Sequence, residues 1–427
     1  MARLKRGDLP PQMLARPPGR RSRALSRRLE RSEAPGVNTL QGGEPAVVWA
    51  QALGVNVLDV DGNRYLDFTS GFGASAVGHR HPDVVAAVRR QSAALLHGLG
   101  DVAAHPARVD LAEELVGRAP LPDARVHFAI SGADAVEVAL KTARLATGRP
   151  GVVAFAPAYH GTTLGALAAG SREAFRAPFA DWLNPHVARL AFGCDAGALE
   201  RALAGGHVAA VLVEPIVGRE GVHIPPAGWL TAVAEICRRH GTLLIADEIL
   251  TGCGRTGTFF AVDHEGIEPD LLCCGKALGG GMPIAAVLGG RDLMAAWDPG
   301  DDGEALHTAT FLAHPLACAA ALATLAVLTR DRLDERAGRL GERLALLLAS
   351  WPRRLPGVVA VRGRGLLWGV ELDSAARAGG VRRQARDRGL LLLGSGPVLE
   401  LCPPLTISEE LLLLGCDLLS ESLTAAN

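Results

Sequence analysis

Lysine is rare in this chain, and one lysine stands where a reactive amine could be placed. The 427 residues include only Lys5, Lys141 and Lys276 among 44 Lys and Arg residues, so the other 41 are arginines. Lys276 lies in the glycine-rich segment 274–281, directly after an apolar run, and glycines let a ligand approach the backbone closely. A solvated surface charge is not expected there, so Lys276 is the candidate nucleophilic amine.

Two more segments that follow apolar runs could complete a site around this amine. Asp247 ends the run 243–246, where burial disfavours a carboxylate unless a cation, such as a protonated pyridine nitrogen, pairs with it. The segment 131–133 opens a predicted helix, whose free N–H groups can stabilise a phosphate dianion by up to about 2 kcal/mol. Taken alone, that segment is more often an ordinary helix cap. With Lys276, however, the two segments indicate one cofactor site.

Two other kinds of site are not expected from the motifs. The segment 252–257 has the spelling GxGxxG, but a dinucleotide-binding turn joins a strand directly to a helix, and here Asp247 and Glu248 end the strand. Three histidines stand near the site motifs without an HExxH pattern or a carboxylate-flanked cluster, so no metal site is predicted. These histidines are His79, His81 and His160.

Composition excludes several classes of partner. With 44 basic and 45 acidic residues the formal charge is −1, which gives no overall field to attract nucleic acid or anionic lipid, so the expected partners are small molecules. The eight cysteines include no CxxC pair, which favours a reduced, cytoplasmic protein. The longest leucine-rich run, 411–419, is far shorter than the roughly 20 residues that a membrane helix needs. No membrane span is therefore expected.

Positive charge gathers in the first 31 residues, which hold ten Lys or Arg against Asp8 and Glu30. A mitochondrial presequence has such a bias, but prolines at 10, 11, 17 and 18 would interrupt its amphipathic helix. A flexible arm or a helix lying on the surface is expected instead.

Apolar runs alternate with helical stretches from Val126 to Cys274, a pattern that predicts an α/β domain with a mainly parallel sheet. Ligands of such sheets bind outside the carboxyl ends of the strands. After a predicted helix over 315–329 the pattern changes to a helix near 337–350, short strands and a final helix from Glu409, which indicates a smaller α+β domain. We expect a basic arm over 1–35, a segment over 36–75 that packs with the small domain, a large domain over 76–325 and a small domain over 326–427.

Several segments, in order between about Gly36 and Leu405, resemble the class III aminotransferases. These are pyridoxal-phosphate (PLP) enzymes of fold type I, and they include the ornithine, acetylornithine and 4-aminobutyrate aminotransferases. The most specific matches are VEPI at 213–216, IADEILTGCGRTG at 245–257, GKALGGGMP at 275–283 and TATFLAHPLA at 308–317. DVDGNRYLDF at 59–68 and GHRHP at 78–82 resemble the N-terminal strand pair of the family and the segment after it.

The resemblance implies roles for the residues singled out above and for several others. Lys276 would bind the cofactor covalently and then shuttle the substrate proton, and Asp247 would keep the pyridine nitrogen protonated. Tyr159 and Ile249 would stack on the two ring faces, and Glu214 would line the oxygen side of the ring. The remaining implied cofactor contacts are Ser131, Gly132, Ala133, His160 and Thr310. Thr310 would reach the phosphate of the neighbouring subunit, which implies a homodimer with shared active sites.

Two charges are exchanged relative to the family pattern. Many relatives have a glutamate where this chain has Arg219, and an arginine before Pro-Pro-Leu where this chain has Glu400. In 4-aminobutyrate-type enzymes these two residues form a switchable pair whose arginine binds the substrate's α-carboxylate. In this chain, either Arg219 takes over carboxylate recognition or Glu400 favours a cationic amine such as a diamine.

The expected function is therefore a PLP-dependent aminotransferase that works by two half-reactions. It would move an amino group from an ω-amino acid, a diamine or a related amine to a keto acid. An aminomutase or an amino-acid racemase or epimerase would use the same Lys276 and Asp247, so the motifs leave these alternatives open. A non-catalytic homologue is not expected, because Lys276, Asp247 and Tyr159 are all present.

Overall fold

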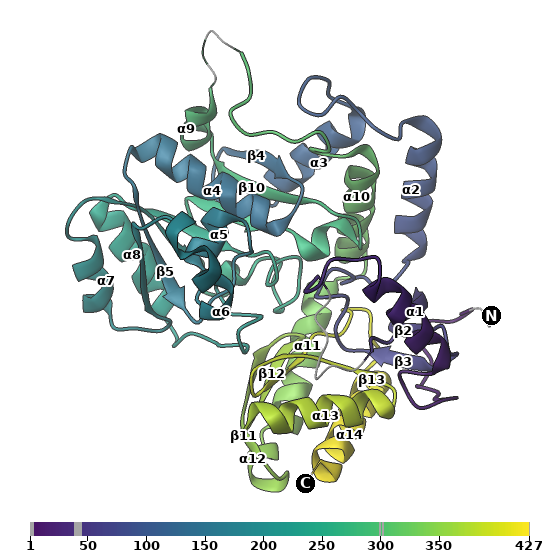
Figure 1. The fold of residues 1–427 in the computed structure, drawn as a ribbon. Coiled ribbons are helices and arrows are strands. Elements are labelled where there is room, and N and C mark those ends of the chain that lie inside the picture. The colour runs from purple at the N-terminus through teal and green to yellow at the C-terminus, as the bar shows by residue number, and fades with distance from the viewer. Residues whose placement is uncertain (1–3, 38–44, 299, 301–302, 427) are drawn as a thin grey trace. The chain divides into compact units, whose positions relative to one another are not determined.

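The computed structural model describes residues 4–37, 45–298, 300 and 303–426. These residues form two compact units, which are described separately here (Figure 1). The terminal unit contains the described residues up to His81 together with those from Arg336 onward, and the central unit is Pro82–Glu335. Residues 1–3 of the predicted arm and 38–44 of the predicted 36–75 segment lie outside the described residues.

The central unit is built on a seven-stranded sheet with the strand order β4-β10-β9-β8-β7-β5-β6. Neighbouring strands from β9 to β6 pair in parallel, and β10 pairs antiparallel with both β9 and β4, so β4 points the same way as the parallel strands. The prediction of a mainly parallel sheet is confirmed. The strands are β4 (Ala124–Ala129), β5 (Gly151–Ala156), β6 (Val187–Ala191), β7 (Val208–Val213), β8 (Leu243–Asp247), β9 (Leu271–Cys274) and β10 (Ala285–Gly290).

Helix α4 (Gly132–Thr147) packs against β9 and β10 (Figure 1). The helix begins where the Ser131 hydroxyl accepts the N–H of Asp134 at 3.2 Å, and it ends at Gly148, whose φ of +68° suits glycine. Small and β-branched residues such as Val136 and Ala139 form its buried face, which lets the helix lie close to the sheet. The other helices of this unit are α2 (Pro82–Ala94), α3 (Pro106–Val116), α5 (Leu164–Ala169), α6 (Glu173–Arg176), α7 (Ala196–Leu203), α8 (Trp229–His240), α9 (Arg291–Met294) and α10 (Pro315–Arg330).

The terminal unit contains two four-stranded sheets, with the orders β1-β2-β3-β13 and β11-β12-β15-β14. The apolar run 390–393 is divided between two strands, because β13 pairs with β3 whereas β14 pairs with β15. The strands are β1 (Trp49–Leu53), β2 (Asn56–Asp59), β3 (Arg64–Asp67), β11 (Val358–Arg364), β12 (Leu367–Leu372), β13 (Leu390–Leu391), β14 (Leu393–Ser395) and β15 (Val398–Leu401). Its helices are α1 (Arg20–Glu30), α12 (Trp351–Arg354), α13 (Ala375–Asp387), α14 (Glu409–Ala425) and most of α11 (Leu333–Leu348).

The basic N-terminal residues form a surface helix that the terminal unit holds at one end. Asp61 accepts the N–H groups of Arg21 at 2.7 Å and Ser22 at 2.9 Å, which satisfies two donors in the first turn of α1. Ser22 and Ser26 are buried, whereas the arginines of the helix are exposed. The positive charges of this segment therefore lie on the exposed side of a helix that the terminal unit holds in place.

Two buried asparagines hold the chain that precedes this helix. Asn56 accepts the N–H of Leu9 at 2.9 Å and donates to its carbonyl oxygen at 2.8 Å. Asn63 accepts the N–H groups of Leu14 at 2.8 Å and Ala15 at 2.9 Å. Both asparagine side chains are fully buried, so the segment is held by polar groups that belong to the interior of the terminal unit.

Membrane insertion by a helix finds no support in this fold. Within the described ranges, no helix combines the length and the apolar character that crossing a bilayer requires.

We predict that the substitution Asn63→Ala lowers the free energy of unfolding by about 1–3 kcal/mol, because it removes the acceptor of the Leu14 and Ala15 N–H groups and one of the donors to the buried Asp59 carboxylate. Urea unfolding followed by circular dichroism measures this change. The matched control is Asn184→Ala, whose exposed amide should cost less than about 1 kcal/mol. Equal effects of the two substitutions would contradict the role given to Asn63.

Candidate active site

The predicted site residues of the central unit follow five strands that point in the same direction. Because the carboxyl ends of such strands lie at one edge of the sheet, the fold gathers these side chains there. Strand β4 is followed by Ser131, Gly132 and Ala133, β5 by Tyr159 and His160, and β7 by Glu214. Strand β8 ends at Asp247 and is followed by Ile249, and β9 is followed by Lys276.

Asp247 is a buried carboxylate that two donors hold in a fixed orientation. Its Oδ2 lies 2.7 Å from Nδ1 of His160, and its Oδ1 accepts the N–H of Ile249 at 3.1 Å. Burial alone would lower the pKa of His160, but the hydrogen bond and the charge of Asp247 raise it overall. The imidazole therefore favours its cationic form and stabilises the carboxylate. No spacing in the sequence indicates that His160 contacts Asp247.

The other ring nitrogen of His160 is buried without a hydrogen-bond partner among the described residues. Buried polar atoms are normally satisfied, and exceptions often mark a place where another group binds. Asp247 and His160 thus form a polar pair, with unused hydrogen-bonding capacity, at the end of β8.

Glu214 joins the turn after β5 to the turn after β7. Its Oε1 accepts the N–H of Tyr159 at 2.9 Å, and its Oε2 accepts the N–H of Gly218 at 3.0 Å. Burial raises the pKa of Glu214 to about 7, an effect that the charge of His160 opposes and the charge of Asp247 reinforces. Glu214 therefore positions the backbones of these two turns, and its place beside the cofactor stays a prediction.

Lys276 begins a short 3₁₀ turn, Lys276–Gly279, and has a φ of +27°. A positive φ is uncommon for a residue with a side chain, and such backbone strain clusters at functional sites. The residue is half-buried and its neighbours Ala277 and Leu278 are buried. The backbone thus holds the lysine in a defined position at the end of β9.

Ile249 lies between the lysine segment and the first turn of α4. A Cβ added to Gly132 would meet the Ile249 side chain at 2.9 Å, and one added to Gly275 would meet it at 3.5 Å. A Cβ on Gly161, whose φ is +129°, would meet Ala133 at 2.4 Å. Only small residues fit here, so the backbone approaches closely around the N-terminus of the 16-residue helix α4, the end that favours an anion.

The guanidinium of Arg219 packs against the ring of Tyr159. The guanidinium carbon of Arg219 lies 4.2 Å from the Tyr159 ring centroid and 5.9 Å from that of Phe175. Arg172 lies 4.8 Å from the Phe175 centroid and forms an ion pair with Glu220 at 2.7 Å. Sequence reasoning missed Phe175 and Arg172, because they lie in an irregular segment around α6 that shows no informative spacing.

Two other predicted site residues do not follow these five strands. Thr310 is exposed and lies in a loop. Its carbonyl oxygen would lie 3.4 Å from a Cβ added to Gly100. Glu400 is a buried residue of β15 in the terminal unit. Its pairing with Arg219 therefore stays a prediction.

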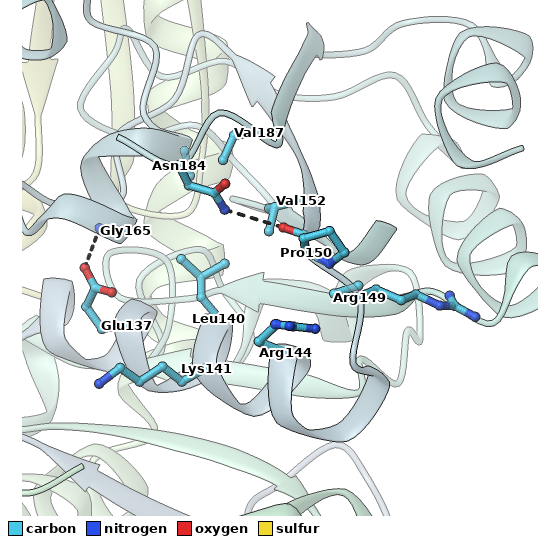
Figure 2. Close-up of a pocket in the computed structure, with 12 residues that line it drawn as sticks. Glu137, Leu140, Lys141, Arg144, Arg149, Pro150, Val152, Gly165, Asn184 and Val187 are labelled. Carbon is cyan, nitrogen blue, oxygen red and sulfur yellow. Dashed lines mark hydrogen bonds between the residues drawn. The ribbon is translucent and has the colours of Figure 1, made fainter. Parts of the chain in front are cut away.

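Figure 2 shows a separate cavity of about 320 Å³ at the other edge of the sheet, where β5, β6 and β7 begin. The polar groups drawn there make contacts within the fold, as Glu137 accepts the N–H of Gly165 at 2.7 Å and Asn184 donates to the carbonyl oxygen of Pro150 at 3.5 Å. This cavity contains none of the predicted site residues.

Comparison with known proteins agrees with the geometry of the site. The sequence profile of the family described as "Aminotransferase class-III" matches residues 40–423. Acetylornithine aminotransferase of Mycobacterium tuberculosis strain H37Rv is 43% identical over 369 residues, which are 86% of this chain and 89% of that protein. The chain belongs to the class-III aminotransferase family.

Solved structures extend the comparison to the fold and the cofactor. The ornithine aminotransferase of Toxoplasma gondii ME49 has a TM-score of 0.87 at 33% identity, covering 95% of each chain. An amine transaminase from an uncultivated Pseudomonas species, solved in its PLP-bound form, has a TM-score of 0.86 at 30% identity, covering 92% of this chain and 98% of that one. The predictions of a fold type I enzyme and of a PLP cofactor are thereby confirmed. The relatives also favour the aminotransferase over the aminomutase and epimerase alternatives.

The residues of this aminotransferase fit its cofactor. PLP offers an aldehyde, a basic ring nitrogen and a phosphate, and the site presents an amine at Lys276, a buried carboxylate at Asp247 and a glycine-lined helix N-terminus at Gly132. The unpartnered nitrogen of His160 also lies in this group. The three kinds of group come from β9, β8 and β4, whose carboxyl ends share one edge of the sheet.

We predict that ionisation of Glu214 destabilises the cofactor-free enzyme. The carboxyl's pKa rises from 4.5 to about 7 on folding, so the unfolded chain loses the proton first as pH increases. The free energy of unfolding should fall between pH 4.5 and 7, by up to about 3 kcal/mol relative to Glu214→Gln, and level off above pH 7. Urea unfolding at a series of pH values measures this difference.

The exposed Glu173 gives a control for this prediction. The substitution Glu173→Gln should leave the pH profile of the wild type nearly unchanged. A Glu214→Gln variant whose profile runs parallel to that of the wild type would contradict the raised pKa.

Proposed function

We propose that this aminotransferase takes the terminal amino group of an ω-amino acid, a diamine or a related amine and transfers it to a keto acid. The observation that carries the proposal is the convergence of Lys276, the Asp247–His160 pair and the first turn of α4 at one sheet edge. Relatives named acetylornithine and ornithine aminotransferases support a donor of this class. A terminal amine is what both named substrates offer.

Lys276 is proposed to bind the cofactor aldehyde covalently through Nζ and to carry the proton during the reaction. With the donor bound, Nζ would act as the general base that takes the proton from the substrate carbon that bears the nitrogen. When bound, PLP supplies an electron-withdrawing ring that stabilises the negative charge left behind. Each half-reaction then needs one proton removed and one returned by the same amine.

Asp247 and His160 are proposed to act on the ring nitrogen. The Asp247 carboxylate would accept a hydrogen bond from the protonated nitrogen, and His160 would hold the carboxylate in the orientation that this needs. Ile249 and Tyr159 would pack against the ring, and the first turn of α4, with Ser131, Gly132 and Ala133, would bind the phosphate. Glu214 holds the Tyr159 backbone in place for this contact.

A homodimer is proposed on the basis of an uncovered apolar surface near Thr310. Leu96, Leu99 and Val102 are 61%, 61% and 77% exposed, and Phe311 is 60% exposed. Gly100 lies against the backbone of Thr310, so these residues belong to one surface. Contiguous exposed apolar residues of this kind mark interaction sites. In the proposed dimer Thr310 reaches the phosphate in the partner subunit.

A cytoplasmic location is proposed from the cysteines. All eight are free, and all except Cys194 are buried. Free thiols in this number are typical of a reducing compartment.

We predict that Lys276→Ala abolishes covalent attachment of PLP and lowers the rate of transamination by at least about 10³-fold, because it removes the proposed carrier of the substrate proton. Absorbance spectra and intact mass after borohydride reduction report attachment. A panel of ω-amino acids, diamines and α-amino acids with pyruvate or 2-oxoglutarate reports the reaction. Lys141→Ala removes the other lysine of the central unit and should change neither result. An active wild type that never forms a new oxo product would contradict the proposal.

We predict that the wild type sediments as a dimer of the 44.5 kDa chain and that Leu96→Glu shifts it towards monomer. A charge at this position must be desolvated to form the interface. Sedimentation velocity measures the change. Leu346→Glu is the control, because that leucine is 74% exposed on α11 and is not one of the residues that form the proposed surface. A monomeric wild type would contradict the shared site.

A further inference from the structure

The contacts of Arg219 and of its neighbours hold it in a defined position beside the proposed cofactor position. Its guanidinium lies on the ring of Tyr159, with 4.2 Å between the guanidinium carbon and the ring centroid. The backbones of Tyr159 and Gly218 both donate to Glu214, at 2.9 and 3.0 Å. One buried carboxylate therefore fixes the positions of the arginine's neighbour and of the ring on which the arginine stacks.

The charge of Arg219 is not matched within the described part of the central unit. The adjacent acid, Glu220, is engaged by Arg172 at 2.7 Å. The contacts of Arg219 in this unit are with the faces of two aromatic rings, Tyr159 and Phe175. Stacking uses the face of a guanidinium and leaves the N–H groups along its edge available for a planar anion.

We propose that Arg219 binds a carboxylate group of the substrate and thereby selects for carboxylated donors and acceptors. The inference rests on the proposed function, whose keto-acid acceptor carries such a group. A guanidinium binds a carboxylate through two parallel N–H···O bonds, which fixes the orientation of the bound molecule as well as its charge. Tyr159 connects this anchor to the reaction, since its neighbour His160 contacts Asp247.

The position of Arg219 also separates two classes of donor. An ω-amino acid presents an amine to Lys276 and a carboxylate to Arg219 at the same time. A diamine of similar length would bring a second cation towards the guanidinium and lose this contact. Arg219 therefore favours the ω-amino acid within the proposed donor class.

The test measures equilibrium binding of glutarate to the holoenzyme by calorimetry, because this dicarboxylate has neither an amine nor an oxo group and cannot react. We expect Arg219→Met, which keeps much of the apolar stem, to weaken glutarate binding about 10- to 100-fold. Arg219→Lys keeps the charge without the planar fork and should fall between the two. Arg144→Gln, which removes an exposed cation of α4, should bind glutarate as the wild type does.

A second arm compares ornithine with 1,4-diaminobutane, which differ only by the carboxylate. The apparent dissociation constant for ornithine should rise in Arg219→Met, whereas that for the diamine should change less than about twofold. Equal weakening of both would assign Arg219 a structural role and overturn the proposal. So would a wild type that binds no glutarate, or one that binds sulfate as tightly with the same dependence on Arg219.

The two proposals can fail separately. If neither donor reacts but glutarate binding depends on Arg219, the donor class is wrong and the carboxylate site stands. If transamination proceeds and Arg219→Met behaves as the wild type, the donor class stands and the carboxylate site is wrong. Unfolding midpoints of the variants within about 2 °C of the wild type exclude a general loss of structure.

Discussion

The contact between Asp247 and His160 is the interaction on which the rest of the site depends. A carboxylate that is 4% exposed at the end of a buried strand is costly unless a cation or several donors compensate it. His160 provides that compensation from the neighbouring turn, and the backbone of Ile249 provides a second donor. These two donors hold the carboxylate in a fixed orientation inside the protein. Placing this pair next to a lysine requires strands that end together, which is what the parallel part of the sheet supplies.

Glu214 also positions residues of the site, and it does so by accepting hydrogen bonds from the backbone. Its oxygens are both occupied by backbone N–H groups, so its main effect is on the positions of Tyr159 and Gly218. A carboxyl group whose pKa lies near 7 also changes the local charge within the physiological range. Two acids and one imidazole thus share a small buried volume.

The central unit and its site were largely predictable from the sequence, and the misses have physical causes. Strands β5, β7, β8 and β9 are continuous apolar runs, as expected for strands buried on both faces, and the site residues directly follow or end them. Strand β10 went unpredicted because Gly289 and Gly290 weaken its pattern, and β6 because its residues are only partly buried. The contact of His160 with Asp247 joins residues 87 positions apart, so no local spacing could reveal it.

Arg219 illustrates what a sequence departure means once geometry is known. An acid at this position would place a negative group on the electron-rich face of Tyr159, which is unfavourable, whereas a cation there is attracted by the ring. The exchange of charge is therefore compatible with the local structure rather than a defect of it. It also changes the field at this edge of the site. Glu214, Asp247 and His160 are buried, whereas Arg219 is only half-buried, so an approaching anion meets the guanidinium before these groups. The charge on the ring of Tyr159 and the charge at the ring nitrogen are thus set by different residues, which lets recognition change while the chemistry at Lys276 and Asp247 is retained.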